Sequence, residues 1–158
     1  MEPQIVRDGE GSHLAMGPAE SLRFVVTADQ VDDQVEFAID VVGTNAGPPL
    51  HIHERHTEIV HVVEGRVYAQ LGDDRVDLSP GDTLIVPPGV MHTMTNLHDT
   101  PARLVAVSTP GGVHAFLAEI AALPQPPDEQ AMAEIGVRHG HRLAGPPLAA
   151  MPAGEEAR

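Results

Sequence analysis

Residues 49–65 read PLHIHERHTEIVHVVEG, and this stretch decides the fold. His51 and His53 are two residues apart, so in an extended strand both side chains leave the same face. Two prolines immediately before them favour the extended backbone that this arrangement requires. Glu58 follows after a short bend, where a neighbouring stretch could bring its carboxylate beside the imidazoles. The sequence therefore predicts a strand with a paired set of histidines and an acidic side chain close by.

A second stretch, residues 81–96, reads GDTLIVPPGVMHTMTN. It predicts a strand, a tight Pro-Pro-Gly turn and a returning strand that carries His92. Three imidazoles and one carboxylate suit Fe, Mn, Ni, Co, Cu or Zn, and do not suit Ca or Mg. We therefore expect His51, His53, Glu58 and His92 to hold one divalent transition metal. Four protein ligands leave one or two positions free on a five- or six-coordinate metal, so substrate or dioxygen could bind there.

The two stretches resemble the two sequence motifs of the cupin superfamily. The first motif is matched at the family spacing by four residues, His51, His53, Glu58 and Gly65. The second is matched by five, Gly81, Pro87, Gly89, His92 and Asn96. One position departs from the pattern, because the family usually has a glycine six residues before the first histidine and this chain has Asn45. Matching positions in two separate segments make the resemblance specific.

Short strand candidates follow one another with turn signals between them. They lie at 22–28, 34–42, 51–54, 58–64, 66–71, 74–78, 82–86, 91–96 and 102–108. Many short strands with regular turns are typical of a sandwich or barrel. Together with the resemblance, this predicts an all-β fold: a single cupin domain, the double-stranded β-helix or jelly-roll barrel, with one or two C-terminal helices.

The chain divides into four segments along its length. We expect a flexible N-terminal arm, the cupin barrel, C-terminal helices packed on the barrel and a loose tail, at residues 1–20, 21–110, 111–145 and 146–158. Apolar residues at helical spacing predict a helix over 113–123. Asp128 is placed to cap a second helix that runs to about His139.

Composition limits the partners and the compartment. The 158 residues carry a formal net charge of -14, which argues against binding to nucleic acid or to an anionic membrane surface. There is no Cys, so any metal must bind to nitrogen and oxygen ligands. The N-terminus lacks the basic start and apolar run of a signal peptide, and no apolar stretch approaches the roughly 20 residues that span a bilayer. We therefore expect a cytoplasmic protein.

Residues 21–148 are similar to the small quercetin-dioxygenase-like cupins of bacteria. The resemblance implies metal-assisted insertion of dioxygen into a flavonol or related enol or aromatic small molecule. In this interpretation Glu58 is a metal ligand and the catalytic base. Two alternatives stay open: a zinc-dependent cyclase or isomerase, and a non-catalytic module that binds metal or a small ligand. The resemblance also implies a homodimer, and apolar residues on both faces of strand 58–64 favour one.

Four residues share strand parity with the expected ligands and are expected to line an apolar substrate cavity: Val60, Val62, Met94 and Asn96. His61 has the opposite parity to Glu58 and should face away from the metal. His56 is expected to be a solvated loop side chain.

Two further histidines, His139 and His141, flank Gly140 just past the predicted second helix. They are expected to form a surface C-cap and not a second metal pair. Tyr68 is assigned no role.

Overall fold

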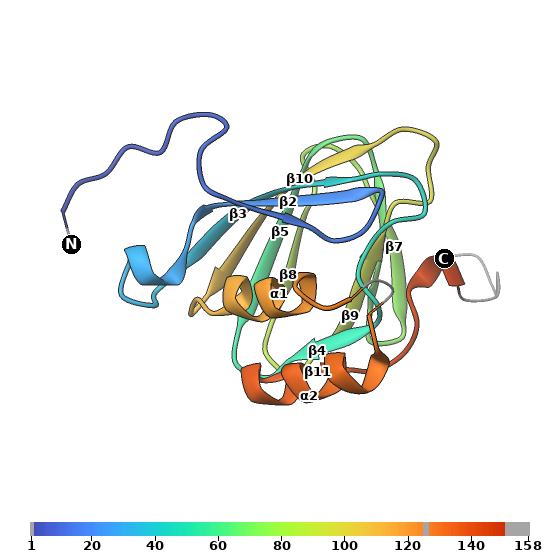
Figure 1. Ribbon diagram of the computed structural model, residues 1–158. Coiled ribbons are helices and arrows are strands. Elements are labelled where there is room, and N and C mark those ends of the chain that lie inside the picture. The colour runs from blue at the N-terminus through green and yellow to red at the C-terminus, as the bar shows by residue number, and fades with distance from the viewer. Residues whose placement is uncertain (1, 125–126, 151–158) are drawn as a thin grey trace.

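The computed structural model describes residues 2–124 and 127–150, and short strands make up most of the fold (Figure 1). The strands are β1 (Ser12–Ala15), β2 (Glu20–Val26), β3 (Glu36–Val42), β4 (His51–His53), β5 (Thr57–Glu64), β6 (Val67–Leu71), β7 (Asp74–Leu78), β8 (Thr83–Val86), β9 (Met91–Thr95), β10 (Ala102–Thr109) and β11 (His141–Leu143). The α-helices are α1 (Val113–Ala121) and α2 (Glu129–His139), and single 3₁₀ turns occur at Ala28–Gln30 and Leu148–Ala150. The predicted all-β fold with two C-terminal helices is confirmed.

The strands form two antiparallel sheets that share one core. The six-stranded sheet has the order β1-β2-β3-β10-β5-β8, and the five-stranded sheet has the order β11-β4-β9-β6-β7. Because successive side chains on a strand point to opposite faces, each strand sends every second residue inward. Buried residues of both sheets pack together in this way: Val42, Val60, Val62, Val67, Ala69, Leu78, Leu84, Val86, Ala102 and Leu104. This is the two-sheet arrangement of a jelly roll, as the motifs predict.

The C-terminal segment covers the edge of the five-stranded sheet. In Figure 1, α1 and α2 lie together, and α2 runs beside β11, which pairs with β4. The Asp128 side chain accepts a hydrogen bond from the Ala131 N–H at 3.1 Å, and Gly140 ends α2 in the left-handed conformation. The predicted helix from Asp128 to His139 is confirmed, and its end leads directly into β11.

The predicted N-terminal arm and C-terminal tail both contain regular structure. Ser12–Ala15 form β1, which pairs with β2, so the expectation of a loose arm over residues 1–20 is wrong there. Leu148–Ala150 form a 3₁₀ turn inside the segment expected to be a loose tail. Residues 151–158 of that tail lie outside the described residues.

The loop before β4 has Asn45 at the position where the cupin motif usually has glycine. Asn45 adopts a φ of 61°, the left-handed conformation that Asn tolerates better than most residues. Its N–H donates to the Asn96 carbonyl oxygen at 2.7 Å. At Gly47 a Cβ atom would lie 2.1 Å from the Met94 carbonyl oxygen, so only glycine fits. The loop is thus tied to β9, the strand that carries the third histidine.

Neither α-helix in residues 2–124 and 127–150 is both long and apolar enough to cross a membrane.

Candidate metal centre

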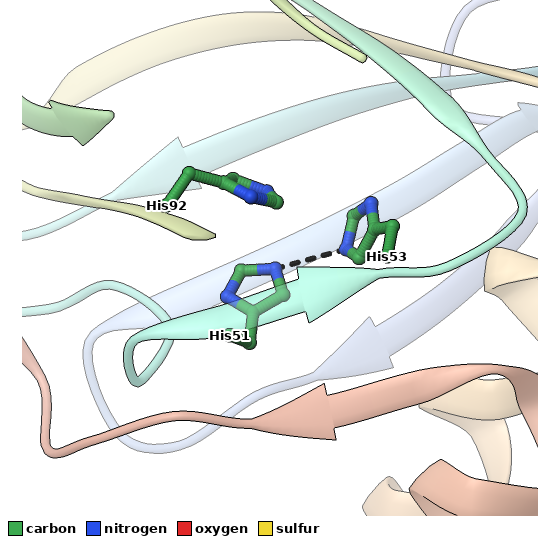
Figure 2. A group of neighbouring side chains, drawn as sticks. All are labelled: His51, His53 and His92. Atoms are coloured by element: carbon green, nitrogen blue, oxygen red, sulfur yellow. Dashed lines mark hydrogen bonds between the residues drawn. The ribbon is translucent and has the colours of Figure 1, made fainter. Parts of the chain in front are cut away.

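Two neighbouring strands of the five-stranded sheet bring three histidines together. β4 pairs with β9 so that His51 lies opposite His92, and His53 follows two residues later on the same face of β4. One ring nitrogen from each of the three lies within 4.8 Å of those of the other two. Figure 2 shows the three imidazoles turned toward one another. Within the described residues this is the only group of three or more side chains that could hold a metal ion.

Backbone carbonyls orient two of the three rings. His51 Nδ1 lies 2.7 Å from the Pro49 carbonyl oxygen, and His92 Nδ1 lies 2.9 Å from that of Val90. Because a carbonyl oxygen can only accept, each Nδ1 carries a proton and donates it. Protonation at Nδ1 reserves Nε2 for a metal, which is the usual arrangement of metal-binding histidines.

The spacing of the donor nitrogens fits a single transition-metal ion. His51 Nε2 and His53 Nε2 are 2.9 Å apart (Figure 2). Two nitrogens at about 2.1 Å from one ion, at a right angle to each other, would be about 3.0 Å apart. The lone pairs of neighbouring nitrogens repel each other unless a proton or a cation lies between them. The donor set and its spacing therefore suit a divalent metal, and nitrogen-rich sites of this kind favour transition metals.

Glu58 comes to the site from the other sheet. It is the first residue of β5 whose side chain points inward, and its Oε2 lies 3.1 Å from His92 Nε2. Its side chain is 12% exposed. Glu58 is not part of the histidine group, in which the donor nitrogens lie within 4.8 Å of one another. Of the three histidines, the one that Glu58 contacts is His92. Burial raises the pKa of Glu58, but the hydrogen bond from His92 and the charges of the three histidines together outweigh it and lower the pKa to about 2. The carboxylate is therefore ionised and available as a fourth donor.

Burial keeps two of the histidines neutral. It lowers the pKa of His51 to about 4 and that of His53 to about 3. Burial would also lower the pKa of His92, but the hydrogen bond to the Glu58 carboxylate raises it. A metal ligand must present an unprotonated nitrogen, so His51 and His53 are ready to bind at neutral pH. At His92 a metal would replace the Nε2 proton that is now donated to the Glu58 carboxylate.

A cavity of about 290 Å³ opens from the histidines. Its wall contains His51, His53, Glu58 and His92, and it runs between the two sheets toward the C-terminal helices. Most of the remaining wall is apolar and includes Leu22, Phe24, Ala38, Leu84, Met94, Ala106, Val113, Phe116, Leu117, Ile120 and Met132. Such a cavity, small and apolar with a few polar groups, is typical of a small-molecule site.

Of the four residues predicted to line this cavity, only Met94 does so. Val60 and Val62 do face inward, as their parity requires, but both are fully buried in the core behind the cavity wall. The prediction fails for them because strand parity gives the face of a sheet and not the depth along it.

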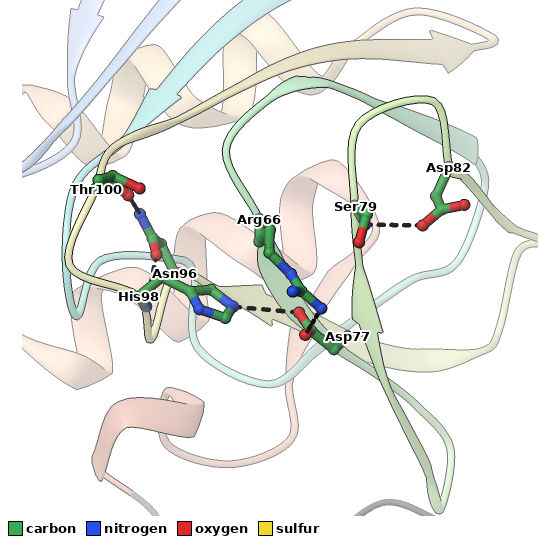
Figure 3. A network of polar contacts seen from close by, with 7 residues as sticks. All are labelled: Arg66, Asp77, Ser79, Asp82, Asn96, His98 and Thr100. Atoms are coloured by element: carbon green, nitrogen blue, oxygen red, sulfur yellow. Dashed lines mark hydrogen bonds and ion pairs between the residues drawn. The ribbon is translucent and has the colours of Figure 1, made fainter.

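Asn96 is the other failed prediction, because its amide is used for folding. Its Nδ2 donates to the Val42 carbonyl oxygen at 2.9 Å and to that of Thr100 at 2.8 Å. Its Oδ1 accepts from the His98 N–H at 2.8 Å. Figure 3 shows Asn96 beside His98 and Thr100, next to the ion pairs that Asp77 makes with Arg66 and His98. Asn96 thus holds the loop after β9 and makes no part of the cavity.

Two histidines expected at the surface are buried beside the metal centre. His56 is 5% exposed, and its Nδ1–H donates to the Pro110 carbonyl oxygen at 2.7 Å. His141 is 3% exposed and pairs with His53 across β4 and β11, with ring centroids 4.5 Å apart. Phe116 stacks on the other side of His141 at 4.0 Å. His141 is buried because β11, only three residues long, pairs with β4 directly after Gly140, and His56 lies beside it with ring centroids 5.3 Å apart.

The other two predictions about histidines are confirmed. His61 faces outward, with Nδ1 2.9 Å from the Thr83 hydroxyl oxygen. His139 lies at the surface, with Nε2 2.7 Å from Glu119 Oε1.

Two acidic residues on the cavity wall were not anticipated from the sequence. Glu20 on β2 and Asp40 on β3 both line the cavity, from the six-stranded sheet. Asp40 pairs with Leu22, which is two residues from Glu20, so all three side chains share the inner face. The only signal in the sequence is alternation in strand 34–42, and alternation does not say which set of residues faces the core.

Comparison with known proteins shows similarity to cupins. Residues 39–108 match the family model described as Cupin domain. Quercetin 2,3-dioxygenase from Bacillus subtilis (strain 168) is 29% identical over 115 residues, which are 72% of this chain and 33% of that protein. The chain spans between a third and about half of the length of the curated relatives it matches first.

Solved structures share the fold at low sequence identity. An RmlC-like cupin from Shewanella frigidimarina NCIMB 400 superposes with a TM-score of 0.60 at 19% identity, covering 70% of this chain and 93% of that one. The polyketide cyclase RemF from Streptomyces resistomycificus superposes with a TM-score of 0.59 at 19% identity, covering 68% and 80%. By the match over residues 39–108 and by its two-sheet fold, the chain is similar to the cupins.

Proposed function

We propose that this protein is a metal-dependent dioxygenase that acts on a flavonol-like or other enol-bearing aromatic molecule. The observation that carries the proposal is the opening of the histidine group and Glu58 directly into a small apolar cavity. Similarity to quercetin 2,3-dioxygenase supports this chemistry. Dioxygen is the second substrate, and both of its atoms enter the products.

His51, His53 and His92 would hold the metal through their Nε2 atoms, with Glu58 as the fourth ligand. When bound, a divalent metal supplies a Lewis acid that stabilises the negative charge of a substrate enolate. The structure fits this role because the nitrogens are preoriented by Pro49 and Val90.

Glu58 is placed to move the proton of the substrate hydroxyl. It supplies the only carboxylate adjoining the histidine group in the described part of the chain, and it is ionised. A carboxylate beside the reacting oxygen can take a proton from an enol or phenol as that oxygen gains negative charge. Residues of α1, among them Phe116 and Leu117, close the cavity on the side facing the helices. Their apolar side chains favour a flat aromatic substrate and exclude water.

Two other functions use the same residues. A zinc-dependent cyclase or isomerase would need the Lewis acid and Glu58 but no dioxygen, and the fold similarity to a polyketide cyclase keeps this option open. A non-catalytic module would bind a metal or a small ligand without turnover.

Oxygen uptake separates these functions. The purified protein, with its metal identified by elemental analysis, is mixed with flavonols and catechols while dissolved oxygen is recorded. We expect one equivalent of oxygen consumed per flavonol, and none with His51→Ala. His61→Ala, which alters a histidine on the outer face of β5, is the matched control and should retain activity. Conversion of substrate without oxygen uptake would favour the cyclase or isomerase, and binding without conversion would favour the module.

A further inference from the structure

The cavity has polar groups at two places, and only one of them is the metal centre. The three histidines lie on β4 and β9 of the five-stranded sheet, whereas Glu20 and Asp40 lie on the six-stranded sheet. Asp40 pairs with Leu104 of β10, which pairs with Val62 of β5. Val62 is four residues along β5 from Glu58, so one intervening strand and four residues separate Asp40 from Glu58. A molecule in the cavity could therefore face both places at once.

Asp40 has an unused hydrogen-bonding atom. Its side chain is 3% exposed, and its Oδ1 has no partner among the described residues. A buried oxygen without a partner costs free energy, of the order of 1–3 kcal/mol in proteins. Glu36, another acid of the wall, differs in this respect, because its Oε2 accepts from the His114 N–H at 3.0 Å. Asp40 is therefore the buried acid that is free to bond to a ligand.

Glu20 and Asp40 act as a pair. They are diagonal neighbours on the inner faces of β2 and β3, which places their side chains within reach of each other. Burial raises the pKa of Glu20 to about 7, and burial and the charge of Glu20 raise the pKa of Asp40 well above its usual range. Both shifts favour a proton on the pair near neutral pH. The pair can then both donate and accept a hydrogen bond, as a hydroxyl group requires of its partner.

We propose that Glu20 and Asp40 form a second polar subsite, on the wall opposite the histidines, that binds a hydroxyl group of the substrate. The subsite rests on the proposed function in one respect, since it assumes that the substrate of the metal centre occupies this cavity. It selects a molecule with an apolar body and at least two oxygen groups, one for the metal and one for the acid pair. A carboxylate at this second position is disfavoured, because Glu20, Asp40 and Glu58 give the wall negative charge.

Binding of matched probes tests the subsite without turnover. 2-Naphthol carries one hydroxyl donor on an apolar body, and 2-methoxynaphthalene keeps the oxygen but cannot donate. Dissociation constants are measured by fluorescence titration of the purified protein, with its native metal, under anaerobic conditions. We expect wild type to bind 2-naphthol roughly tenfold tighter than its methyl ether, as for a hydrogen bond to a charged acceptor.

Glu20→Gln and Asp40→Asn keep the size of each side chain and remove its acid. The amide oxygens can still accept a hydrogen bond but carry no charge, so each should reduce the preference for 2-naphthol to about threefold while binding of the methyl ether stays unchanged. Glu36→Gln is the matched control, since glutamine can still accept from the His114 N–H, and it should keep the preference. Testing the two acids separately leaves a readout if one variant does not fold.

An equal preference in wild type and in both variants would overturn the subsite, as would the absence of any preference in wild type. The result is separate from the proposed function. Flavonol oxidation with an unaltered naphthol preference would remove the subsite alone, whereas loss of the preference without any oxygen uptake would leave the subsite in place and remove the dioxygenase.

Discussion

The Glu58 carboxylate lies 3.1 Å from His92 Nε2, although the two residues belong to different sheets. This contact joins the only carboxylate beside the histidine group, in the described part of the chain, to the group itself. It also gives Glu58 two possible roles, as a ligand and as a base, and the two can be separated by experiment.

We expect Glu58→Gln to affect turnover more than metal binding. Three imidazoles remain in the variant, and three protein ligands hold the metal in many catalytic sites. Glutamine keeps the size and one oxygen donor but cannot accept a proton at neutral pH. Metal occupancy should fall modestly, and the rate should fall by roughly 10²–10⁴-fold, as for the loss of a general base. Metal content and turnover are measured on the same preparation. Full activity with full metal would remove Glu58 from the mechanism, and parallel loss of both would leave it as a ligand only.

His141 is expected to support the metal centre through His53. The two carbonyl-bonded histidines have partners for Nδ1, but His53 Nδ1 is buried without one among the described residues, as are both ring nitrogens of His141. The two rings are 4.5 Å apart, so a modest rotation would let His53 Nδ1–H donate to His141.

Loss of such a partner lowers metal affinity by roughly 10–100-fold. His141→Leu should show this loss in a competition titration with a chelator, while His61→Leu on the outer face should not. The metal-free His141→Leu protein should unfold at an unchanged or higher urea concentration, because a buried polar group is removed. An unchanged metal affinity would mean that His141 only fills space.

The six-stranded sheet has an apolar outer face that favours the predicted homodimer. Ile85 is 61% exposed, Val41 41% and Val63 39%, on three strands of this sheet. Exposed apolar side chains gathered on one face mark an interaction surface. Light scattering at micromolar concentration should give twice the monomer mass of 16.8 kDa. Ile85→Lys should shift the mass toward the monomer, whereas Val76→Lys on β7 of the other sheet should not. A monomeric wild type would refute the dimer.

The raised pKa of Glu20 predicts how stability changes with pH. Its pKa is 4.5 in a solvated chain and about 7 in the folded protein, so between these values the folded state binds more protons. Stability from this group is therefore full below about pH 4.5 and falls as the pH rises through 7. The loss is of the order of 3 kcal/mol.

Glu20→Gln removes this dependence, so its stability relative to wild type should rise between pH 5 and pH 8. Urea unfolding of the metal-free proteins at a series of pH values measures the difference. Glu64→Gln, an exposed position on β5, is the matched control. Parallel curves for wild type and Glu20→Gln would show that the Glu20 carboxyl titrates as in solvent.

The histidine pair and His92 were predictable because cupin motifs join residue type to spacing. A His-x-His strand after two prolines leaves little choice of face, and the turn before His92 returns the chain to that strand. The strands were predictable for a similar reason, since glycine and proline mark each turn. The loop lacks the usual glycine at position 45, and Asn45 adopts there a positive φ, which glycine also allows.

The features that were missed depend on contacts distant in sequence. His141 is buried because the three residues of β11 pair with β4. A strand of three residues is too short to show an alternation of polar and apolar residues in the sequence. On β3 the inward residues are Glu36, Ala38, Asp40 and Val42, while the more apolar alternate set faces outward. Alternation alone would place the apolar set in the core. This reversal places Glu36 and Asp40 on the wall of the cavity and leaves apolar side chains such as Val41 on the outer face of the sheet.

The most direct test of the metal centre is the metal content of the purified protein, measured by elemental analysis beside its histidine variants. We expect close to one equivalent of a divalent transition metal in wild type and in His61→Ala, and a loss of most of it in His51→Ala and His92→Ala. Wild type that binds no transition metal, even after it is offered iron, manganese, cobalt, nickel, copper and zinc, would contradict the account. So would a metal that stays bound when His51 and His92 are replaced.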